Sequence, residues 1–365
     1  MQTIIDQITA TLHTAAERGQ PLHIQGGGSK AFYGHPRTES AESLDITPYQ
    51  GIVNYESTEL VITARAGTRL SEIESVLREH GQMLAFEPPH FANTATLGGC
   101  VAAGLSGPRR ASAGAVRDFV LGVRMLDGTG RDLHFGGQVM KNVAGYDISR
   151  LMVGSMGTLG VLLEVSLKVL PLPVAEKTIC LEMNATQAIK QMNQWAGKPL
   201  PISAACHVDE QLSIRLSGAE TAIRAAQTQL GGESRADGDT FWQALREQTH
   251  PFFKPATPLW RLSIKSTAPE YHLPGKQLME WNGALRWLAC QNDQDNEGSR
   301  SDNAAHVIRE AAKAAGGHAT LFRGHHHATP VFHPLTPALL SLHRRLKQQF
   351  DPAGILNPGR LYPEF

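Results

Sequence analysis

The sequence predicts an α+β fold built as two domains. Segments with helical spacing alternate with short strand-like runs, and Asp127–Gly130 gives a hairpin turn signal between two such runs. The second half of the chain follows the order β-α-β-β-α-β, which is typical of a ferredoxin-like split unit. A length of 365 residues suggests two domains at about 150 residues each. Pro171 and Pro173 follow the last strand of the first half, so we place the boundary at residue 172.

The first 172 residues begin with a helix and continue mostly as strands. Ile4, Ile5, Ile8 and Leu12 recur at helical spacing, and Gly19 ends that helix. A second helix is expected from residue 70 to Gly81. The expected strands are 22–25, 52–55, 60–65, a β-rich run over 116–126, 131–135 and 161–170.

Beyond residue 172 the pattern changes to an alternation of helices and strands. We expect strands at 177–183, 202–208, 211–216 and 259–265, with helices at 186–196 and 218–230. Residues 291–303 read as a polar loop. A helix over 337–350 and a proline-punctuated tail complete the chain, which gives a third segment, 336–365, behind a domain of residues 173–335.

Composition excludes several classes of function. The 34 basic and 34 acidic residues cancel, so there is no overall footprint of a nucleic-acid binder or of a polybasic membrane anchor. The N-terminal stretch lacks a signal-peptide pattern, and the longest apolar stretch, 151–174, is interrupted by Glu164 and Lys168. We therefore expect a cytoplasmic protein that does not insert into a membrane directly.

The four cysteines, at positions 100, 180, 206 and 290, are too dispersed for a C-x-x-C metal or iron–sulfur pattern. They are most simply reduced thiols, and the chain is expected to carry no iron–sulfur relay of its own.

Small residues are concentrated in three loops of the first half. The first is Gln25-Gly26-Gly27-Gly28-Ser29-Lys30, directly after an expected strand, where glycine N–H groups, a hydroxyl and a cation could hold a phosphate. The others are residues 96–104 (TLGGCVAAG) and 154–160 (GSMGTLG). Each alone could equally be a flexible loop, a close helix packing or a plain connection. Together they favour a large planar cofactor that contains a pyrophosphate.

The glycine loop does not match two common nucleotide-binding motifs. It has neither the G-x-G-x-x-G spacing nor a Gly-Lys-Ser/Thr sequence. The sequence therefore disfavours a nicotinamide-binding Rossmann domain and a P-loop NTPase.

The motifs in combination resemble a known family. GGGS, PPH followed by TLGGCVAAG, GPRRASAGAVRDFVLG, KNVAGYD and GSMGTLGVLLEVSLKVLP occur in the order found in the PCMH-type, vanillyl-alcohol-oxidase-like FAD-linked oxidases, and the tail FDPAGILNPGR is similar to their 2-hydroxyacid members. SGPRR and VMKNVAGYD resemble the FAD-binding subunits of bacterial glycolate oxidases (glycolate dehydrogenases). The resemblance implies a two-part FAD domain over 1–172, a ferredoxin-like cap over 173–335 and a C-terminal segment, 336–365, that returns to the FAD domain.

The resemblance also implies which residues bind FAD. Gln25, Gly26, Gly27, Gly28, Ser29 and Lys30 would cradle the pyrophosphate. A second phosphate-facing loop would comprise Thr96, Gly98 and Gly99, with Pro88 near the ring system. Gly114 and Asp118 would lie beside the flavin or ribityl chain, and Gly157, Gly160 and Val161 on the adenine or isoalloxazine side. Asn357 and Arg360 would close the flavin pocket from the tail.

Two departures from the family pattern modify these expectations. Covalent members carry a His in or near the glycine loop, whereas Gly26–Lys30 contains none, so FAD is expected to be non-covalent. Larger 2-hydroxyacid members carry a metal-binding H-x-G-D-G-N-type segment, and this chain has Arg323-Gly324-His325-His326-His327 instead. Independent substrate oxidation is therefore in doubt, and no metal site is predicted. Adjacent histidines point in different directions, so His325–His327 with His333 fit a solvated loop better than a metal site.

A 2-hydroxy acid requires a cation to hold its carboxylate and a base near its hydroxyl. Our candidates are Arg261, Arg323 and His318, although each arginine could instead form a structural ion pair.

The expected function is oxidation of glycolate, or of a related short 2-hydroxy acid, by an FAD-binding subunit. The resemblance implies two partners: a second, larger FAD-binding subunit and an iron–sulfur subunit. These partners would hold the complex at the cytoplasmic face of the inner membrane. Two alternatives stay open: a self-sufficient oxidase of another hydroxy acid or alcohol, and an assembly subunit with a vestigial flavin site.

Overall fold

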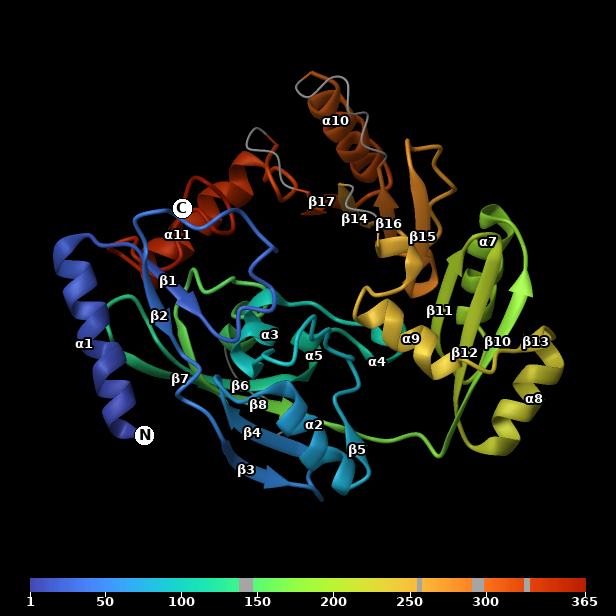
Figure 1. Cartoon of the computed structure of the whole chain (residues 1–365), viewed down its shortest axis with the longest axis horizontal. Helices are drawn as coiled ribbons and strands as arrows, with labels where there is room; N and C mark the ends of the chain where they lie inside the picture. The colour runs from blue at the N-terminus through green and yellow to red at the C-terminus, as the bar shows by residue number, and fades with distance from the viewer. Residues whose placement is uncertain (138–146, 255–257, 291–298, 325–328) are drawn as a thin grey trace. The chain divides into compact units, whose positions relative to one another are not determined.

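The computed structural model describes residues 1–137, 147–254, 258–290, 299–324 and 329–365, with side chains omitted for 299–302. The chain divides into two compact units. The first comprises 1–106, 114–172 and 334–365, and the second 107–113 and 173–333. Mixed helices and antiparallel sheets confirm the α+β class (Figure 1). Most of the KNVAGYD motif, the acidic part of the polar loop and His325–His327 lie outside the described residues.

The first unit is centred on a five-stranded antiparallel sheet. Its strands, in spatial order, are β3 (Ile52–Glu56), β4 (Val61–Arg65), β8 (Val161–Lys168), β6 (Val120–Leu126) and β7 (Asp132–Gly136). The central strand β8 is buried at six of its eight positions, and only Glu164 and Lys168 are partly exposed. A strand covered on both faces reads as a continuous apolar run rather than an alternation.

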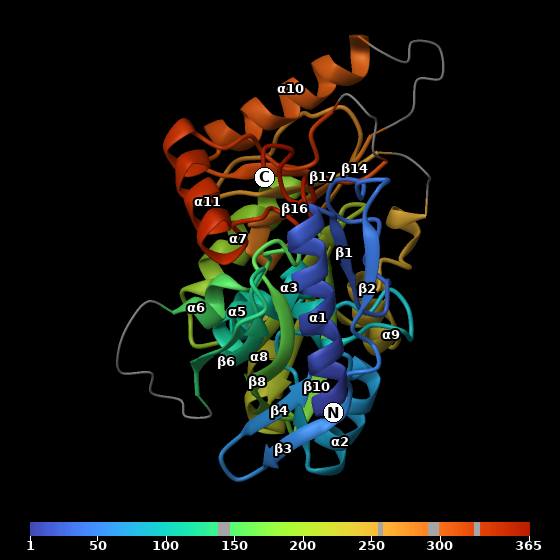
Figure 2. The same ribbon diagram turned by 90° about the vertical axis from the view of Figure 1, so that its left-hand side faces the viewer.

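Helices and minor strands complete the first unit. These are α1 (Gln2–Arg18), α2 (Leu70–Glu79), α3 (Leu97–Ala103), α5 (Val116–Phe119), α6 (Ile148–Leu151), α11 (Pro337–Phe350), the parallel pair β1 (Leu22–Gln25) and β2 (Glu42–Asp45), and the pair β5 (Gln82–Met83) and β9 (Leu170–Pro171). Helix α1 lies alongside β1 and β2 in both views (Figures 1 and 2) and buries Ile5, Ile8 and Leu12. It ends at Gly19, which adopts the left-handed conformation of a helix C-cap.

The run 116–126 is only partly a strand, so that expectation was wrong at its start. Residues Val116–Phe119 form the short helix α5, and β6 begins at Val120. The Asp118 carboxylate accepts a hydrogen bond from the Ala115 N–H at 2.8 Å, which caps the first turn. The cap therefore overrides the strand preference of the β-branched Val116.

The C-terminal segment joins the N-terminal strand. The Leu22 N–H donates to the Ile355 carbonyl at 2.7 Å, and the Asn357 N–H donates to the Leu22 carbonyl at 3.0 Å. A buried ion pair holds this segment in place, because Lys347 Nζ lies 2.7 Å from Asp351 Oδ2. Lys347 also donates to the carbonyls of Thr158 and Leu356. Burial lowers the pKa of Lys347, and the neighbouring Asp351 charge opposes that effect.

The second unit is built on an eight-stranded sheet. Its spatial order is β13 (Glu233–Ser234), β10 (Ala175–Glu182), β12 (Gln211–Gly218), β11 (Ile202–Val208), β15 (Lys276–Glu280), β16 (Leu285–Ala289), β14 (Leu259–Ser263) and β17 (His318–Arg323). Its helices are α4 (Arg110–Ala113), α7 (Ala185–Ala196), α8 (Glu220–Leu230), α9 (Gly238–Arg246) and α10 (Ser299–Ala314), with 3-10 turns at Pro251–Phe253 and Trp281–Gly283.

The ferredoxin-like unit is present, but its fourth strand is not the predicted one. The order β13-β10-β12-β11 places β12 between the strands that α7 connects, which is the split arrangement. Its last strand is β13, whereas the predicted run at 259–265 forms β14 in the other half of the sheet. After α8, Gly231 and Gly232 both adopt positive φ and return the chain directly to β10.

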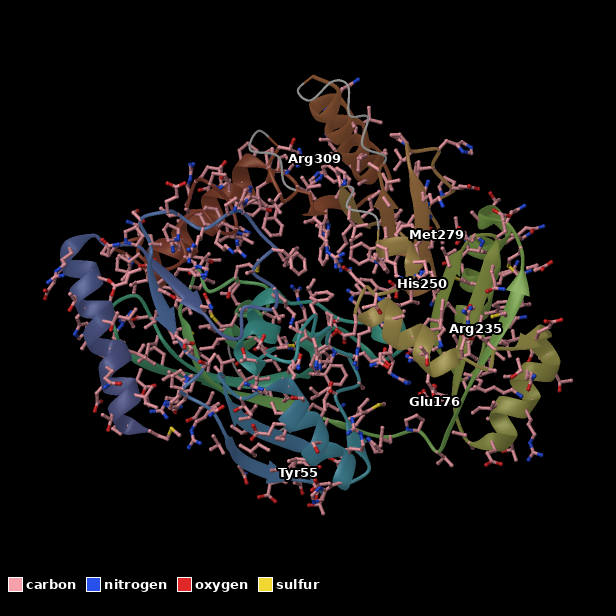
Figure 3. All side chains as sticks on the ribbon, viewed as in Figure 1. Tyr55, Glu176, Arg235, His250, Met279 and Arg309 are labelled. Carbon is pink, nitrogen blue, oxygen red and sulfur yellow. The ribbon has the colours of Figure 1, made fainter. Side chains whose placement is uncertain are left out.

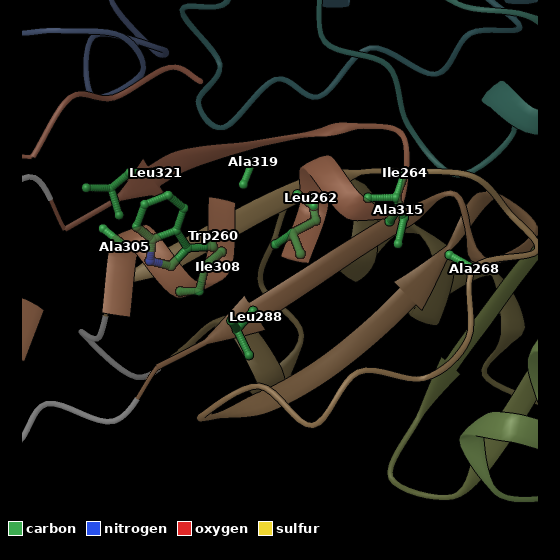
Figure 4. Packing of buried hydrophobic residues seen from close by; sticks show 11 residues of the cluster. Trp260, Leu262, Ile264, Ala268, Leu288, Ala305, Ile308, Ala315, Ala319 and Leu321 are labelled. Atoms are coloured by element: carbon green, nitrogen blue, oxygen red, sulfur yellow. The ribbon is translucent and has the colours of Figure 1, made fainter. Parts of the chain in front are cut away.

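The other half of this sheet packs on α10. Figure 4 shows the cluster formed by Trp260 and Leu262 of β14 with Ile308 of α10 and residues of β16 and β17. Strand residues alternate between faces, so Arg261 lies on the face away from this cluster.

The Lys347–Asp351 pair predicts a stability effect. We expect Asp351→Ala to lower the free energy of unfolding by about 3 kcal/mol, because it leaves a buried ammonium group without its counter-charge. Urea denaturation followed by circular dichroism measures the change. The matched control is Glu310→Gln, which removes the exposed Lys313–Glu310 pair and should cost less than about 0.5 kcal/mol. Equal effects of the two variants would contradict the assigned role of Asp351.

Candidate functional site

Two adjoining cavities in the first unit lie along the glycine loop. The first encloses about 470 Å³ and is lined mainly by apolar and small residues, among them Ile24, Ala66 and Leu162. The second encloses about 620 Å³ and is lined by the whole loop from Gln25 to Lys30. Both are bordered by Gly26, Thr96, Gly99 and Asn357, so they form one elongated hollow.

The glycine loop presents unused backbone donors. Within the described part of the chain, the N–H groups of Gly27, Gly28 and Ser29 donate to no other protein group. The loop is fixed from behind, since Thr94 Oγ1 donates to the Gly27 carbonyl at 2.6 Å. A side chain at Gly27 would collide with the Thr94 carbonyl. Successive free N–H groups form a concavity suited to an anion.

Lys30 adds a positive charge at the end of this loop. Its Nζ lies 3.4 Å from Ser29 Oγ and 3.4 Å from the His90 carbonyl. The side chain also passes over the Phe91 ring, 5.7 Å from its centroid. An ammonium group held beside free N–H groups and a hydroxyl completes a donor set for a phosphate.

The second loop contributes the start of α3. Thr96 caps this helix, since its Oγ1 accepts from the Gly99 N–H at 3.3 Å. Gly98 is packed against Ala66 and donates to its carbonyl at 2.8 Å. Gly99 instead faces both cavities, and an added Cβ would find only Thr96 Oγ1 close by, at 3.2 Å. Gly99 therefore keeps the hollow open, whereas Gly98 serves packing.

The third loop is joined to the first by Asn357. Its Oδ1 accepts from the Ile24 N–H at 2.7 Å, and its Nδ2 donates to the Met156 carbonyl at 2.6 Å. Met156 in turn donates to Ala102 of α3 at 3.0 Å. Gly157 and Gly160 of this loop line the first cavity. One side chain of the tail thus holds two walls of the hollow together.

Arg360 lines the second cavity but uses its guanidinium to hold the protein chain. It donates to the carbonyls of Ala31 at 2.7 Å and Tyr33 at 2.6 Å, and to that of His35. Burial lowers its pKa. Its geometry makes it a support of the segment that follows the glycine loop.

An open polar hollow borders the other side of the glycine loop. It encloses about 910 Å³ and is lined by Asp45, Thr47, Gln50 and Arg69 together with Gln25–Gly27 and Thr96. The sequence did not predict Asp45, Thr47, Gln50 or Arg69 as site residues. Asp45 comes beside the loop only because β1 and β2 pair in parallel, with Gln25 opposite Asp45. A four-residue pattern without alternation does not predict that pairing.

Four expected residues lie outside all three hollows. Pro88 is buried, and Val161 is fully buried in β8 opposite Leu126. Gly114 lies against Asp118, whose carboxylate caps α5. None of the four lines the cavities described above.

Two of the three catalytic candidates share one face of the second unit's sheet. Arg261 pairs with Thr320, and Ser263 with His318, so Arg261 and His318 project from neighbouring strands on the same side. Burial, and next the Arg261 charge, lower the pKa of His318. Arg323 lies at the other end of β17, opposite Leu259, and donates to Gln248 Oε1. The structure therefore brings Arg261 and His318 to one face and places Arg323 at the opposite end of β17 from His318.

The cysteines and the other potential ligands form no cluster among the described residues. All four cysteines are free thiols. Burial raises the pKa of Cys100 and of Cys290 to about 11 and also raises that of Cys206. No three His, Cys, Asp or Glu residues gather as metal ligands in the described ranges. None of the helices described is both long enough and apolar enough to cross a bilayer.

Comparison with protein families matches both ends of the chain. Residues 3–136 match the FAD binding domain, and residues 290–361 match the C-terminal domain of FAD linked oxidases. FAD is therefore the cofactor, and the chain is an FAD-dependent oxidoreductase.

Individual relatives agree with the family matches. The chain is 50% identical over its full length, and over 97% of the relative, to glycolate oxidase subunit GlcE of Escherichia coli. It is 30% identical, over 48% of this chain and 37% of the relative, to glycolate oxidase subunit GlcD of Bacillus subtilis. In fold it resembles 4-ethylphenol oxidase from Gulosibacter chungangensis, with a TM-score of 0.72, 13% identity and coverage of 98% of this chain and 87% of that one. The chain belongs to the FAD-linked oxidases, in the family of the glycolate oxidase subunit GlcE.

Proposed function

We propose that the elongated hollow of the first unit binds FAD non-covalently, with the pyrophosphate on the glycine loop. The observation that carries this proposal is the row of unused N–H groups at Gly27, Gly28 and Ser29 beside the Lys30 ammonium. The adjoining apolar cavity suits a flat ring system. The residues present therefore fit the cofactor that the family requires.

Each loop has a distinct part in this proposal. Gln25–Lys30 hold the pyrophosphate, and Thr96, Gly98 and Gly99 form the facing wall. Gly157 and Gly160 border the ring system, while Asn357 and Arg360 fix the surrounding chain. Pro88, Gly114, Asp118 and Val161 lie outside the hollows and enter the proposal only through the likeness to the family.

We propose further that the chain is the FAD-binding subunit of a heteromeric glycolate oxidase that converts glycolate, or a related short 2-hydroxy acid, to glyoxylate or the corresponding 2-oxo acid. The support is its 50% identity to a protein named as such a subunit. FAD supplies the acceptor for the hydride that leaves the α-carbon. Since the four thiols form no cluster, an iron–sulfur subunit receives the electrons, beside a second, larger FAD-binding subunit. These partners, rather than this chain, would bring the complex to the cytoplasmic face of the inner membrane.

The second unit supplies groups for the substrate in this proposal. The Arg261 guanidinium holds the carboxylate, as a planar fork suits that group. The lowered pKa of His318 keeps its imidazole neutral at pH 7, so it can accept the proton of the α-hydroxyl group. Arg323 is the weaker candidate because it lies at the opposite end of β17 from His318.

Gly99→Ala tests the cofactor site without removing a structural contact. The methyl group enters the hollow, so we expect FAD to bind at least ten-fold more weakly, measured by flavin absorbance per protein and by titration of the apoprotein. The same change favours helix α3, so a loss of FAD cannot be attributed to unfolding. Gly197→Ala is the matched control, because a Cβ there, at the end of α7, meets only the Gln194 carbonyl at an ordinary contact distance of 3.8 Å. Unchanged FAD affinity in Gly99→Ala would refute the assignment.

Acid precipitation tests the mode of attachment. No histidine lies within the Gly26–Lys30 loop, so we expect trichloroacetic acid to leave all flavin absorbance in the supernatant. Yellow, fluorescent protein in the pellet would show a covalent bond.

Anaerobic addition of glycolate tests where oxidation occurs. We expect the flavin of this chain to bleach only when the partner subunits are present. Bleaching of the purified chain alone would favour the self-sufficient oxidase. An absence of flavin absorbance, even after FAD is added, would favour the assembly subunit.

A further inference from the structure

Residues 107–113 form part of the second unit although their neighbours in sequence belong to the first. Contacts with several elements hold this segment on the second unit. Trp281 Nε1 donates to the Gly107 carbonyl at 3.0 Å, and Ser112 Oγ donates to the Ser203 carbonyl at 3.0 Å. The Arg109 guanidinium pairs with Glu176, labelled on β10 in Figure 3, at 2.5 Å. The segment is therefore fixed at both ends and in its middle.

This attachment determines where the neighbouring Arg110 lies. Arg109 is buried and bound to Glu176. Arg110 instead lies over the Trp281 ring, with its Cζ 4.3 Å from the ring centroid. Arg261 reaches the same indole from β14, with its Cζ 5.2 Å from the centroid. Two guanidinium groups that are 151 positions apart in sequence thus converge on one aromatic ring.

The indole itself is held in an unusual backbone conformation. Trp281 and Asn282 both have positive φ, at 54° and 57°. The Asn193 side chain fixes this turn, since its Nδ2 donates to the Asn282 carbonyl at 3.3 Å and to the Ser266 carbonyl at 3.0 Å. Two consecutive left-handed residues without glycine persist only where the surroundings impose them, and such strain gathers at functional sites. The buried Trp281 is thus a rigid platform rather than a side chain that merely fills the core.

We propose that Arg110 and Arg261, both in contact with the Trp281 ring, form the site that binds the carboxylate of the substrate. This inference rests on the proposed function for its substrate class, small 2-hydroxy acids, and adds Arg110 and Trp281 to the machinery. A planar ring orients both guanidinium groups, and each can offer parallel N–H donors to a carboxylate oxygen.

Two further ionisable side chains lie beside these residues. His318 lies on the same face as Arg261, two positions along the neighbouring strand from the residue opposite it. Glu280 precedes Trp281, and its carboxylate accepts from Trp287 Nε1 at 2.9 Å. A single carboxylate between two guanidinium groups leaves the adjacent His318 free to face the α-hydroxyl of a short acid.

The test measures binding of oxalate, a non-oxidisable carboxylate, to the full-length chain by isothermal titration calorimetry. We expect Arg110→Gln and Arg261→Gln each to weaken binding at least ten-fold. Arg110→Lys should recover part of the loss, because it restores the charge but not the planar fork. The matched control is Arg309→Gln, since Arg309, labelled on α10 in Figure 3, lies over Trp260 at 5.3 Å in the same unit. That control should bind oxalate as the wild type does.

The outcomes separate this inference from the proposed function. Wild-type affinity for oxalate in Arg110→Gln, or no oxalate binding by the wild-type chain, would overturn the carboxylate site. Either result leaves the flavin site intact if absorbance still shows bound FAD. Conversely, loss of FAD with normal oxalate binding would contradict the proposed FAD site and leave the carboxylate site standing. If Arg110→Gln loses oxalate affinity but not its circular dichroism spectrum, misfolding is excluded as the cause.

Discussion

The buried ion pair between Lys347 and Asp351 is the constraint on which the elongated hollow of the first unit depends. Its carboxylate also accepts from the N–H groups of Ile355 and Leu356, so it shapes the chain just before Asn357. Its ammonium group reaches the Thr158 carbonyl in the third loop. A buried pair contributes little net stability but enforces one geometry when it is fully hydrogen-bonded. Here that geometry places Asn357 between Ile24 of β1 and Met156 of the third loop.

The glycines of the hollow divide into two classes that a sequence cannot distinguish. At Gly27 and Gly98, other parts of the chain occupy the space that a side chain would need. At Gly99, that space belongs to the hollow. In the sequence, both classes appear as glycine within the same loops. Only at Gly99 does the missing side chain itself leave room for a ligand, whereas Gly27 can contribute to binding through its backbone N–H group.

Much of the architecture could be predicted from local patterns, and the failures have physical causes. The glycine loop after β1 and the central strand β8 follow from composition and periodicity over a few residues. Strand β13 was missed because two residues give no periodic signal, and α5 because its cap outweighs the preference of Val116 for a strand. Candidate site residues within one loop could be named, but Asp45 could not, because it reaches the hollow through strand pairing. Arg110, which belongs to the proposed carboxylate site, was missed because its place depends on a contact with Trp281 far along the chain.

The pairing of Leu22 with residues 355–357 determines when the first unit can finish folding during synthesis. Strand β1 leaves the ribosome early, but the chain that completes its hydrogen bonds is synthesised more than 330 residues later. Contacts of such long sequence separation form late and slowly. The elongated hollow is therefore completed only after residues 355–357 have been synthesised, and until then the glycine loop lacks one of its walls. Under the proposed assignment, the chain can retain a flavin in this hollow only after that segment has joined β1.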